Sequence, residues 1–292
     1  SRVIDRPMRP LFPKDMRNDV TIIITVMSVD PDNSPEVAGM IGASIATAIS
    51  DIPWNGPIGC VVMGLVDDQI VVCPDAQQKE RSQMAVTVAA TKEKVVMIEA
   101  GAKEVPEDIV IESIRVAHEE IKKTVDFINE IVAQIGKEKF SYPSMVVEES
   151  MFDQVEAYCR PAVEKALMNV DKTVRDKMIA EVTADVNEHF AEEYPEQEPQ
   201  LGECIYKLQK KIVRHWIIDE HKRVDGRGIN DIRPLAAEVG LLPRTHGSGL
   251  FTRGQTQVLT VATLGSISDQ QLLDGIDDQE FKRYMHHYNF PS

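Results

Sequence analysis

The chain has 292 residues, a formal net charge of −15, 43% hydrophobic residues and 27% charged residues. This balance is ordinary for a soluble globular protein of about two domains. No apolar run approaches the roughly 20 residues that a membrane-spanning helix needs. The four cysteines lie far apart, which argues against a zinc site or a disulfide framework and favours reduced thiols in a cytoplasmic protein.

Both ends of the sequence look cut. Residues 1–6 contain neither an initiator Met nor the apolar core of a signal peptide, and residues 288–292 do not look like a natural C-terminus. We therefore expect an internal fragment of a longer protein.

Charge is distributed unevenly along the chain. Residues 1–17 carry five basic and two acidic residues, and residues 207–233 carry eight basic and four acidic ones. Between these basic segments, residues 148–200 carry fourteen acidic and five basic residues. A polyanion could bind the basic segments while the acidic one faces away, although charge blocks are also common on surfaces without such a role.

The first half of the chain mixes strand and helix signals. Residues 20–29 are β-branched and predict a buried strand, and small residues within an apolar stripe at 37–49 predict a helix that packs closely on a sheet. Apolar residues at helical spacing predict a long amphipathic helix that begins near Pro106 and ends at Gly136. Further strands are predicted at 58–66, 69–73, 84–91 and 95–99, the first two forming a hairpin that turns at Asp67-Asp68.

The pattern changes at Glu148. Three apolar stripes at helical spacing run from 152 to 170, from 174 to 190 and from 205 to 216, with no strand signal between them. These stripes predict an all-helical module over 148–221. Strand signals resume at 236–241 and 257–264, so the fold class is α+β with a helical module in the middle.

Arginines and glycines alternate after this module, at 222–233 and again at 245–256. Glycine lets the backbone approach a ligand closely, and arginine supplies a planar, permanently charged fork that fits phosphate. This arrangement is typical of phosphate binding. The alternative is a turn and a hairpin that carry solvated arginines, because short Gly/Arg patterns have low specificity.

The order of these parts, together with several specific motifs, resembles the bacterial polynucleotide phosphorylase family. The motifs lie at 1–13, 50–59 and 99–104 in the first part and at Asp225-Gly226-Arg227, Phe251-Thr252-Arg253-Gly254 and Tyr288-Asn289-Phe290-Pro291 in the last part. The resemblance implies a partial RNase PH-like βαβ domain at 1–147, an all-helical domain at 148–221 and the start of a second RNase PH-like domain at 222–292.

The resemblance also implies an activity. Members of the family form homotrimers and degrade single-stranded RNA from the 3′ end with inorganic phosphate and Mg²⁺, releasing nucleoside diphosphates in mRNA turnover. Degradosome components are possible partners, and the location is cytoplasmic. The chemistry is phosphoryl transfer, in which arginines hold RNA phosphates and the metal offsets charge on the leaving oxygen.

No catalytic residue or metal ligand is expected in this chain, because the family's working site would lie beyond Ser292. Ala85 and Thr87 stand where the second domain would place a metal-binding Asp and a Lys, and an acidic turn at 30–35 replaces the phosphate loop. RNA or phosphate binding is predicted for Arg227, Arg253, Arg6 and Arg9. The alternative for each is a structural ion pair, with Asp225 ordering the Arg227 turn.

Two other classes of function stay open at this point. The isolated chain could be a catalytically inactive module for RNA binding or trimer assembly. It could also be a different user of a βαβ fold, such as a small-molecule kinase, but no Gly/Ser-rich ATP loop is present.

Overall fold

The structure is a computed structural model that describes residues 1–276 and 279–290. The chain divides into two compact units. The first unit holds residues 1–145 and the short stretch that begins at Gly275, and the second holds residues 146–274 and the chain from Gln279 onward. The domain boundaries expected from the sequence stay predictions.

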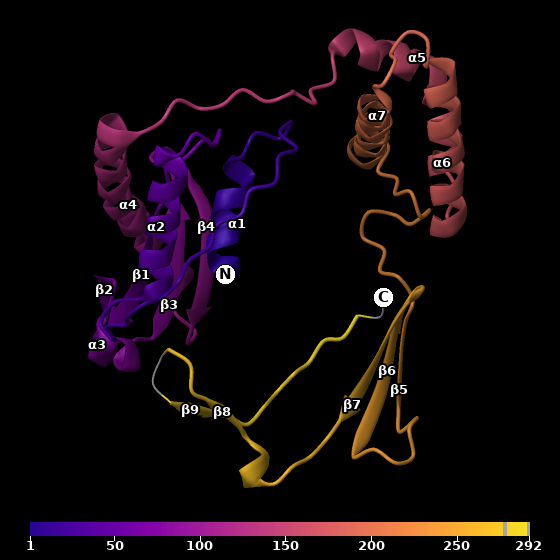
Figure 1. Ribbon diagram of the computed structural model, residues 1–292. Helices are drawn as coiled ribbons and strands as arrows, with labels where there is room; N and C mark the ends of the chain where they lie inside the picture. The colour runs from indigo at the N-terminus through magenta and orange to yellow at the C-terminus, as the bar shows by residue number, and fades with distance from the viewer. Residues whose placement is uncertain (277–278, 291–292) are drawn as a thin grey trace. The chain divides into compact units, whose positions relative to one another are not determined.

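A four-stranded sheet forms the centre of the first unit (Figure 1). Its strands are β1 (Gly59–Val66), β2 (Gln69–Val72), β3 (Met84–Ala90) and β4 (Val95–Ala102), in the order β2-β1-β3-β4. Every neighbouring pair is antiparallel, so β2 and β3 point the same way on either side of β1. Helix α3 (Ala76–Arg81) connects them, which makes a βαβ unit. The strands predicted at 58–66, 69–73, 84–91 and 95–99 and the α+β class are confirmed.

The predicted hairpin turn between β1 and β2 is also confirmed. Asp67 and Asp68 both have positive φ, at 51° and 62°. Two successive residues with positive φ give the turn type whose twist matches that of paired strands, and Asp tolerates this conformation better than most residues.

Two helices pack on this sheet. Helix α2 (Pro35–Ile49) and helix α4 (Glu107–Ile135) both contact β1, and the buried residues of α4 include Ala117, Ile121 and Val125 at the predicted helical spacing. The approach of α4 is close at Gly59, where an added Cβ would lie 3.0 Å from Ile121 Cγ2. A glycine at this position therefore lets the helix backbone lie directly against β1.

The first residues of the chain fold onto the same core. Helix α1 (Arg2–Met8) continues into a short 3₁₀ helix, η1 (Arg9–Leu11), and Met8 is fully buried. The indole Nε1 of Trp54 donates a hydrogen bond to the Met8 carbonyl at 3.1 Å. A buried indole N–H needs an acceptor, so this bond fixes the end of α1 on the core.

The prediction of a buried strand at 20–29 is wrong. This segment forms no regular element, and Ile23 and Met27 are 84% and 88% exposed. A strand requires a neighbour that satisfies its backbone N–H and C=O groups, and none of the described strands pairs with this segment. High β propensity identifies a residue that fits a sheet surface, but it cannot supply the partner strand.

Three helices form the core of the second unit. Helices α5 (Glu149–Leu167), α6 (Lys172–His189) and α7 (Glu198–Ile218) are the helical module, as predicted, and each contacts the other two. Their shared core includes Val155, Cys159, Leu208 and Trp216. Burial raises the pKa of the Cys159 and Cys204 thiols to about 11, so both behave as apolar side chains at neutral pH.

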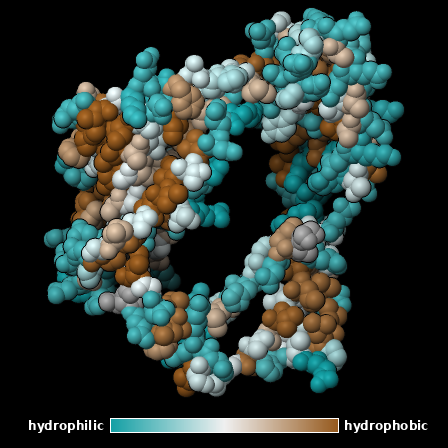
Figure 2. Space-filling view, in the orientation of Figure 1, coloured by the Kyte–Doolittle hydropathy of each residue, from teal (hydrophilic) through white to brown (hydrophobic). Residues whose placement is uncertain are grey.

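A three-stranded antiparallel sheet follows the helical module. It consists of β5 (Leu235–Val239), β6 (Gly247–Arg253) and β7 (Thr256–Ala262), and the strands predicted at 236–241 and 257–264 are confirmed. Figure 2 shows apolar surface over this sheet, where Phe251, Leu259 and Val261 are about half exposed. A 3₁₀ helix η2 (Ile267–Asp269) and a small β8–β9 ladder (Gln271–Leu273 with Glu280–Lys282) come next.

In the part of the chain that the structure describes, no helix is both long and apolar enough to cross a membrane.

Candidate nucleic-acid interface

The Arg/Gly segment after α7 is a tightly bonded loop. Gly226 has φ +78°, a conformation that glycine adopts without strain. This turn places Asp225 beside Arg227, whose Nε and Nη2 donate to Asp225 Oδ2 at 2.9 and 2.6 Å. Arg227 Nη1 also donates to the Asp231 carbonyl at 2.9 Å. Three of the five guanidinium N–H donors of Arg227 are therefore used inside the loop. This arrangement is the one expected of a structural ion pair.

The loop is held against the helical module. Lys222 donates its backbone N–H to the Trp216 carbonyl, and its Nζ lies 4.6 Å from the centre of the Trp216 ring. Val224 packs on the module's apolar core. The cation over the indole and the partly buried Val224 together fix the start of the segment, so Arg227 projects from an ordered base.

The hydrogen bonds from Arg227 lower the pKa of the Asp225 carboxyl, against a smaller opposing effect of burial. A carboxyl group with a lowered pKa in the folded state stabilises that state fully above its unfolded pKa of roughly 3.9, and the contribution is lost as the pH falls through the lower folded value. We therefore expect the Arg227 Nε–H NMR resonance to stay protected from solvent exchange at neutral pH and to lose protection only below about pH 4. Asp225→Asn, which cannot ionise, should remove this pH dependence, and loss of protection already near pH 6 would contradict the assignment.

Arg253 has a different environment. It ends β6, opposite Leu235 of β5 and Thr256 of β7, and is followed by Gly254 at φ +60°. Its side chain is exposed and makes no hydrogen bond or ion pair with any residue that the structure describes. Of the four predicted arginines, Arg253 therefore has the guanidinium most available to an external phosphate.

Arg6 and Arg9 belong to the first unit and are both paired. Arg6 Nη1 lies 2.9 Å from Glu99 Oε2 on β4, and Arg9 donates two hydrogen bonds to Asp5, at 2.7 and 3.1 Å. The hydrogen bond with Asp5 raises the pKa of Arg9. These pairs join α1 to β4 and brace η1. Arg227 and Arg253 lie on separate elements of the second unit, and no described hydrogen bond or ion pair joins them.

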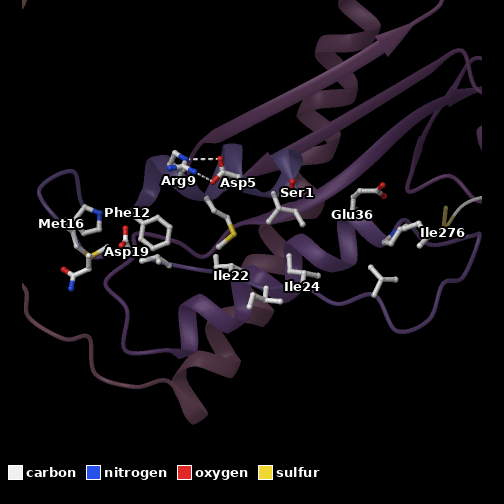
Figure 3. A pocket seen from close by; sticks show the side chains of 18 residues that line it. Ser1, Asp5, Arg9, Phe12, Met16, Asp19, Ile22, Ile24, Glu36 and Ile276 are labelled. Atoms are coloured by element: carbon white, nitrogen blue, oxygen red, sulfur yellow. Dashed lines mark hydrogen bonds and ion pairs between the residues drawn. The ribbon is translucent and has the colours of Figure 1, made fainter. Parts of the chain in front are cut away.

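A cavity of about 830 Å³ lies beside α1 in the first unit (Figure 3). Its walls are mainly apolar and include Phe12, Ile22 and Ile24, with Asp5 and Arg9 bonded to each other at the rim. The remaining charged lining residues, Asp19 and Glu36, are acidic. Because phosphate needs free donors and positive charge, this cavity does not have the chemistry of a phosphate site.

The acidic turn at 30–35 is satisfied internally. Asn33 Nδ2 donates to Asp30 Oδ2 at 2.7 Å, and the Ala76 backbone N–H donates to Asp32 Oδ1 at 3.0 Å. The hydrogen bond from Asn33 is the main cause of a lowered pKa at Asp30. Across residues 1–276 and 279–290, no group of three or more His, Cys, Asp or Glu side chains is placed to hold a metal ion.

Sequence reasoning missed one partner in the Arg/Gly loop. Asp231 Oδ2 accepts the Gly228 backbone N–H at 2.8 Å, and its carbonyl accepts Arg227. The spacing of Gly228 and Asp231, three residues apart, is typical of a turn closed by an Asp side chain and could have indicated this role.

Comparison with known families matches most of the chain. The 3′ exoribonuclease family, domain 1, matches residues 1–53 and 231–292, and domain 2 of the same family matches residues 56–120. The polyribonucleotide nucleotidyltransferase RNA-binding domain matches residues 150–228. Because domain 1 matches two separate parts of the chain, the chain contains parts of two copies of this domain. The chain thus combines 3′ exoribonuclease domains of the RNase PH type with a helical RNA-binding domain.

Curated relatives cover the whole chain. It is 56% identical over 291 residues to the polyribonucleotide nucleotidyltransferase of Ruminiclostridium cellulolyticum, and 55% identical over 294 residues to that of Lachnoclostridium phytofermentans. Identity to the corresponding protein of Syntrophomonas wolfei is 46% over 291 residues. All three alignments cover 100% of this chain and 41–42% of the relative. The chain belongs to the polyribonucleotide nucleotidyltransferase family and spans about two fifths of the length of these relatives.

Proposed function

We propose that this chain is part of a phosphorolytic 3′-to-5′ exoribonuclease that degrades single-stranded RNA with inorganic phosphate and releases nucleoside diphosphates. The observation that carries the proposal is the set of 46–56% identical relatives, named polyribonucleotide nucleotidyltransferases, that align with the entire chain. The order of the exoribonuclease and RNA-binding domain matches supports it.

In this proposal the described residues bind and orient RNA, and the reacting groups lie outside residues 1–292. Arg253 contributes a guanidinium that has no described partner and can form two parallel hydrogen bonds to one phosphate. Arg227 has two N–H donors left after its bonds to Asp225 and Asp231, so it can contact RNA while ordering its own loop. Arg6 and Arg9 would have to exchange carboxylate partners for phosphate.

Mg²⁺ is proposed as the cofactor of the whole enzyme. The carboxylates that the structure describes do not gather into a group that fits the ion, so its ligands are assigned to residues outside this chain. Bound there, Mg²⁺ would offset the charge that develops on the leaving oxygen. Homotrimer formation, a role in mRNA turnover, degradosome partners and a cytoplasmic location belong to the same proposal.

The test is phosphate-dependent release of ADP from poly(A) with Mg²⁺. We expect no release by residues 1–292 alone and robust release by the same polypeptide extended to the full length of its relatives. A folded, full-length protein that releases no ADP would refute the proposal. Release by residues 1–292 alone would instead show that a working site lies within them.

A second candidate is a catalytically inactive module for RNA binding or trimer assembly. It is favoured by the match of residues 150–228 to an RNA-binding domain. RNA binding by the full-length protein without phosphorolysis would support this candidate over the first.

Arg253→Gln should weaken binding of a labelled oligo(A) strand and leave the thermal midpoint unchanged, since Arg253 has no partner among the residues that the structure describes. Losing one phosphate contact should reduce the slope of log affinity against log salt by about 0.7. The matched control is Arg244→Gln, which removes an exposed arginine next to the same sheet. Equal slopes for the two variants would exclude a specific contact by Arg253.

A further inference from the structure

Helix α7 has two chemically different faces. Its buried face consists of Leu201, Cys204, Ile205, Leu208, Ile212 and Trp216. On the opposite face Lys207, Lys210 and Arg214 follow one another at intervals of three and four residues, and all three are exposed. This spacing puts their side chains in one row, which spans about 10 Å at 1.5 Å per residue. We call this row the α7 stripe.

The cations of the stripe have no partners in the described part of the chain. Elsewhere in the helical module, Arg160 pairs with Glu156 and Glu164 at 2.6 and 2.9 Å, and Lys211 pairs with Glu156 at 2.7 Å. Lys172 and Lys177 also lie within ion-pair distance of carboxylates on α6. Within the described residues, Lys207, Lys210 and Arg214 form no ion pair or side-chain hydrogen bond.

The stripe is also unfavourable for the helix itself. Its members are each other's neighbours at three and four residues, where like charges destabilise a helix. Glu203 lies four residues before Lys207 but does not pair with it in the described structure. The helix dipole favours a cation only in the last turn of a helix, where α7 carries His215, so it accounts for none of the three cations of the stripe. This repulsion costs only about 0.2–0.5 kcal/mol per pair, and binding of an external polyanion would relieve it.

An exposed aromatic ring lies next to the stripe. Tyr206 is 60% exposed, stands four residues before Lys210, and makes no ring contact in the part of the chain that the structure describes. Exposed rings beside cations are the arrangement that binds single-stranded nucleic acid, because the cations hold phosphates while a base stacks on the ring. An acidic peptide would use the cations but has no need of the ring.

We propose that Lys207, Lys210 and Arg214 bind consecutive phosphates of single-stranded RNA and that Tyr206 stacks on one of its bases. This inference rests on the proposed function, since it assumes that RNA is the natural ligand. It assigns a binding face to the helical module that is separate from Arg227 and Arg253. Contacts of this kind recognise the backbone and any base, so the stripe binds without sequence preference.

The test measures binding of a 5′-labelled oligo(A) strand by fluorescence anisotropy over a series of salt concentrations, without phosphate or Mg²⁺. The variant Lys207→Gln/Lys210→Gln/Arg214→Gln should bind at least tenfold more weakly at low salt, and its salt slope should fall by about 2, at 0.7 for each lost contact. Tyr206→Leu should weaken binding about tenfold and leave the slope unchanged.

The matched control is Lys165→Gln/Lys172→Gln/Lys177→Gln, which removes three exposed cations from α5 and α6. Equal losses in both triple variants, or no loss in either, would overturn the proposal. Displacement of oligo(A) by polyglutamate at lower concentration than by unlabelled oligo(A) would also overturn it and indicate an acidic protein partner. Circular dichroism checks the helices, and if the triple variant loses helicity, Lys210→Gln alone decides through a slope change of about 0.7.

Because the assay contains no reaction, its result is independent of phosphorolysis. A stripe-dependent change in slope in a protein that releases no ADP would leave the binding face in place and refute only the proposed activity.

Discussion

Trp216→Ala should unfold the helical module at a much lower urea concentration than the parent chain. Trp216 is 5% exposed, packs in the core that α5, α6 and α7 share, and carries Lys222 over its ring. Truncating a buried Trp removes apolar contacts and leaves a cavity, at a cost of about 3–5 kcal/mol. The loop that holds Arg227 should lose its anchor in the same variant.

Two probes can separate this effect from a general loss of stability. The chain contains two tryptophans, so in Trp216→Ala the fluorescence comes from Trp54 alone, in the core of the first unit. We expect the circular dichroism transition of the helices to move to lower urea while the Trp54 transition stays in place. Ile217→Ala, at a 42% exposed neighbouring position, is the control and should change stability by less than about 0.5 kcal/mol. A common shift of both probes would mean that the two units unfold together.

Ile121→Ala should destabilise the first unit by about 2–5 kcal/mol. Ile121 is fully buried where α4 lies directly on β1, and its Cγ2 occupies the space that the missing side chain of Gly59 leaves free. Because the helix backbone already approaches the strand closely, the site can relax little into the cavity. The measurement is urea unfolding followed by tryptophan fluorescence, in which Trp54 reports on the first unit and Trp216 on the second.

Ile111→Ala on the same helix is the matched control for Ile121→Ala. Ile111 is 57% exposed, so its truncation should leave the Trp54 transition within about 0.5 kcal/mol of the parent. A similar loss of stability in both variants would show that packing on β1 does not determine the effect, because Ala has a higher helix propensity than Ile at both positions.

Periodicity predicted the elements whose burial is local to one helix or one hairpin. The stripe of Ala117, Ile121, Val125 and Ile128 is the buried face of α4, and the stripe of Leu208, Ile212 and Trp216 is that of α7. The Asp67-Asp68 turn was predictable because its conformation depends on two adjacent residues. Motif order within the sequence also indicated the family, which the comparisons confirm.

Elements that form only through contacts with residues far away in the sequence could not be predicted from local periodicity. The segment 20–29 has a strand-like composition but no strand partner among the described residues, and α1, η1 and the β8–β9 ladder carry no strong periodic signal of their own. The apolar cavity beside α1 likewise arises from side chains that only the fold brings together.

The sequence by itself determined the α+β class, the helical module and the concentration of arginines at both ends of the chain, because these follow from composition and short-range spacing. Only the tertiary structure decided which of those cations are available to bind a ligand. Arg6, Arg9 and Arg227 are bonded to carboxylates, whereas Arg253 and the α7 stripe have no described partners. The physical reason is that a side chain's charge is fixed by its chemistry, but its capacity to bind a ligand depends on which neighbours the fold places within hydrogen-bonding distance.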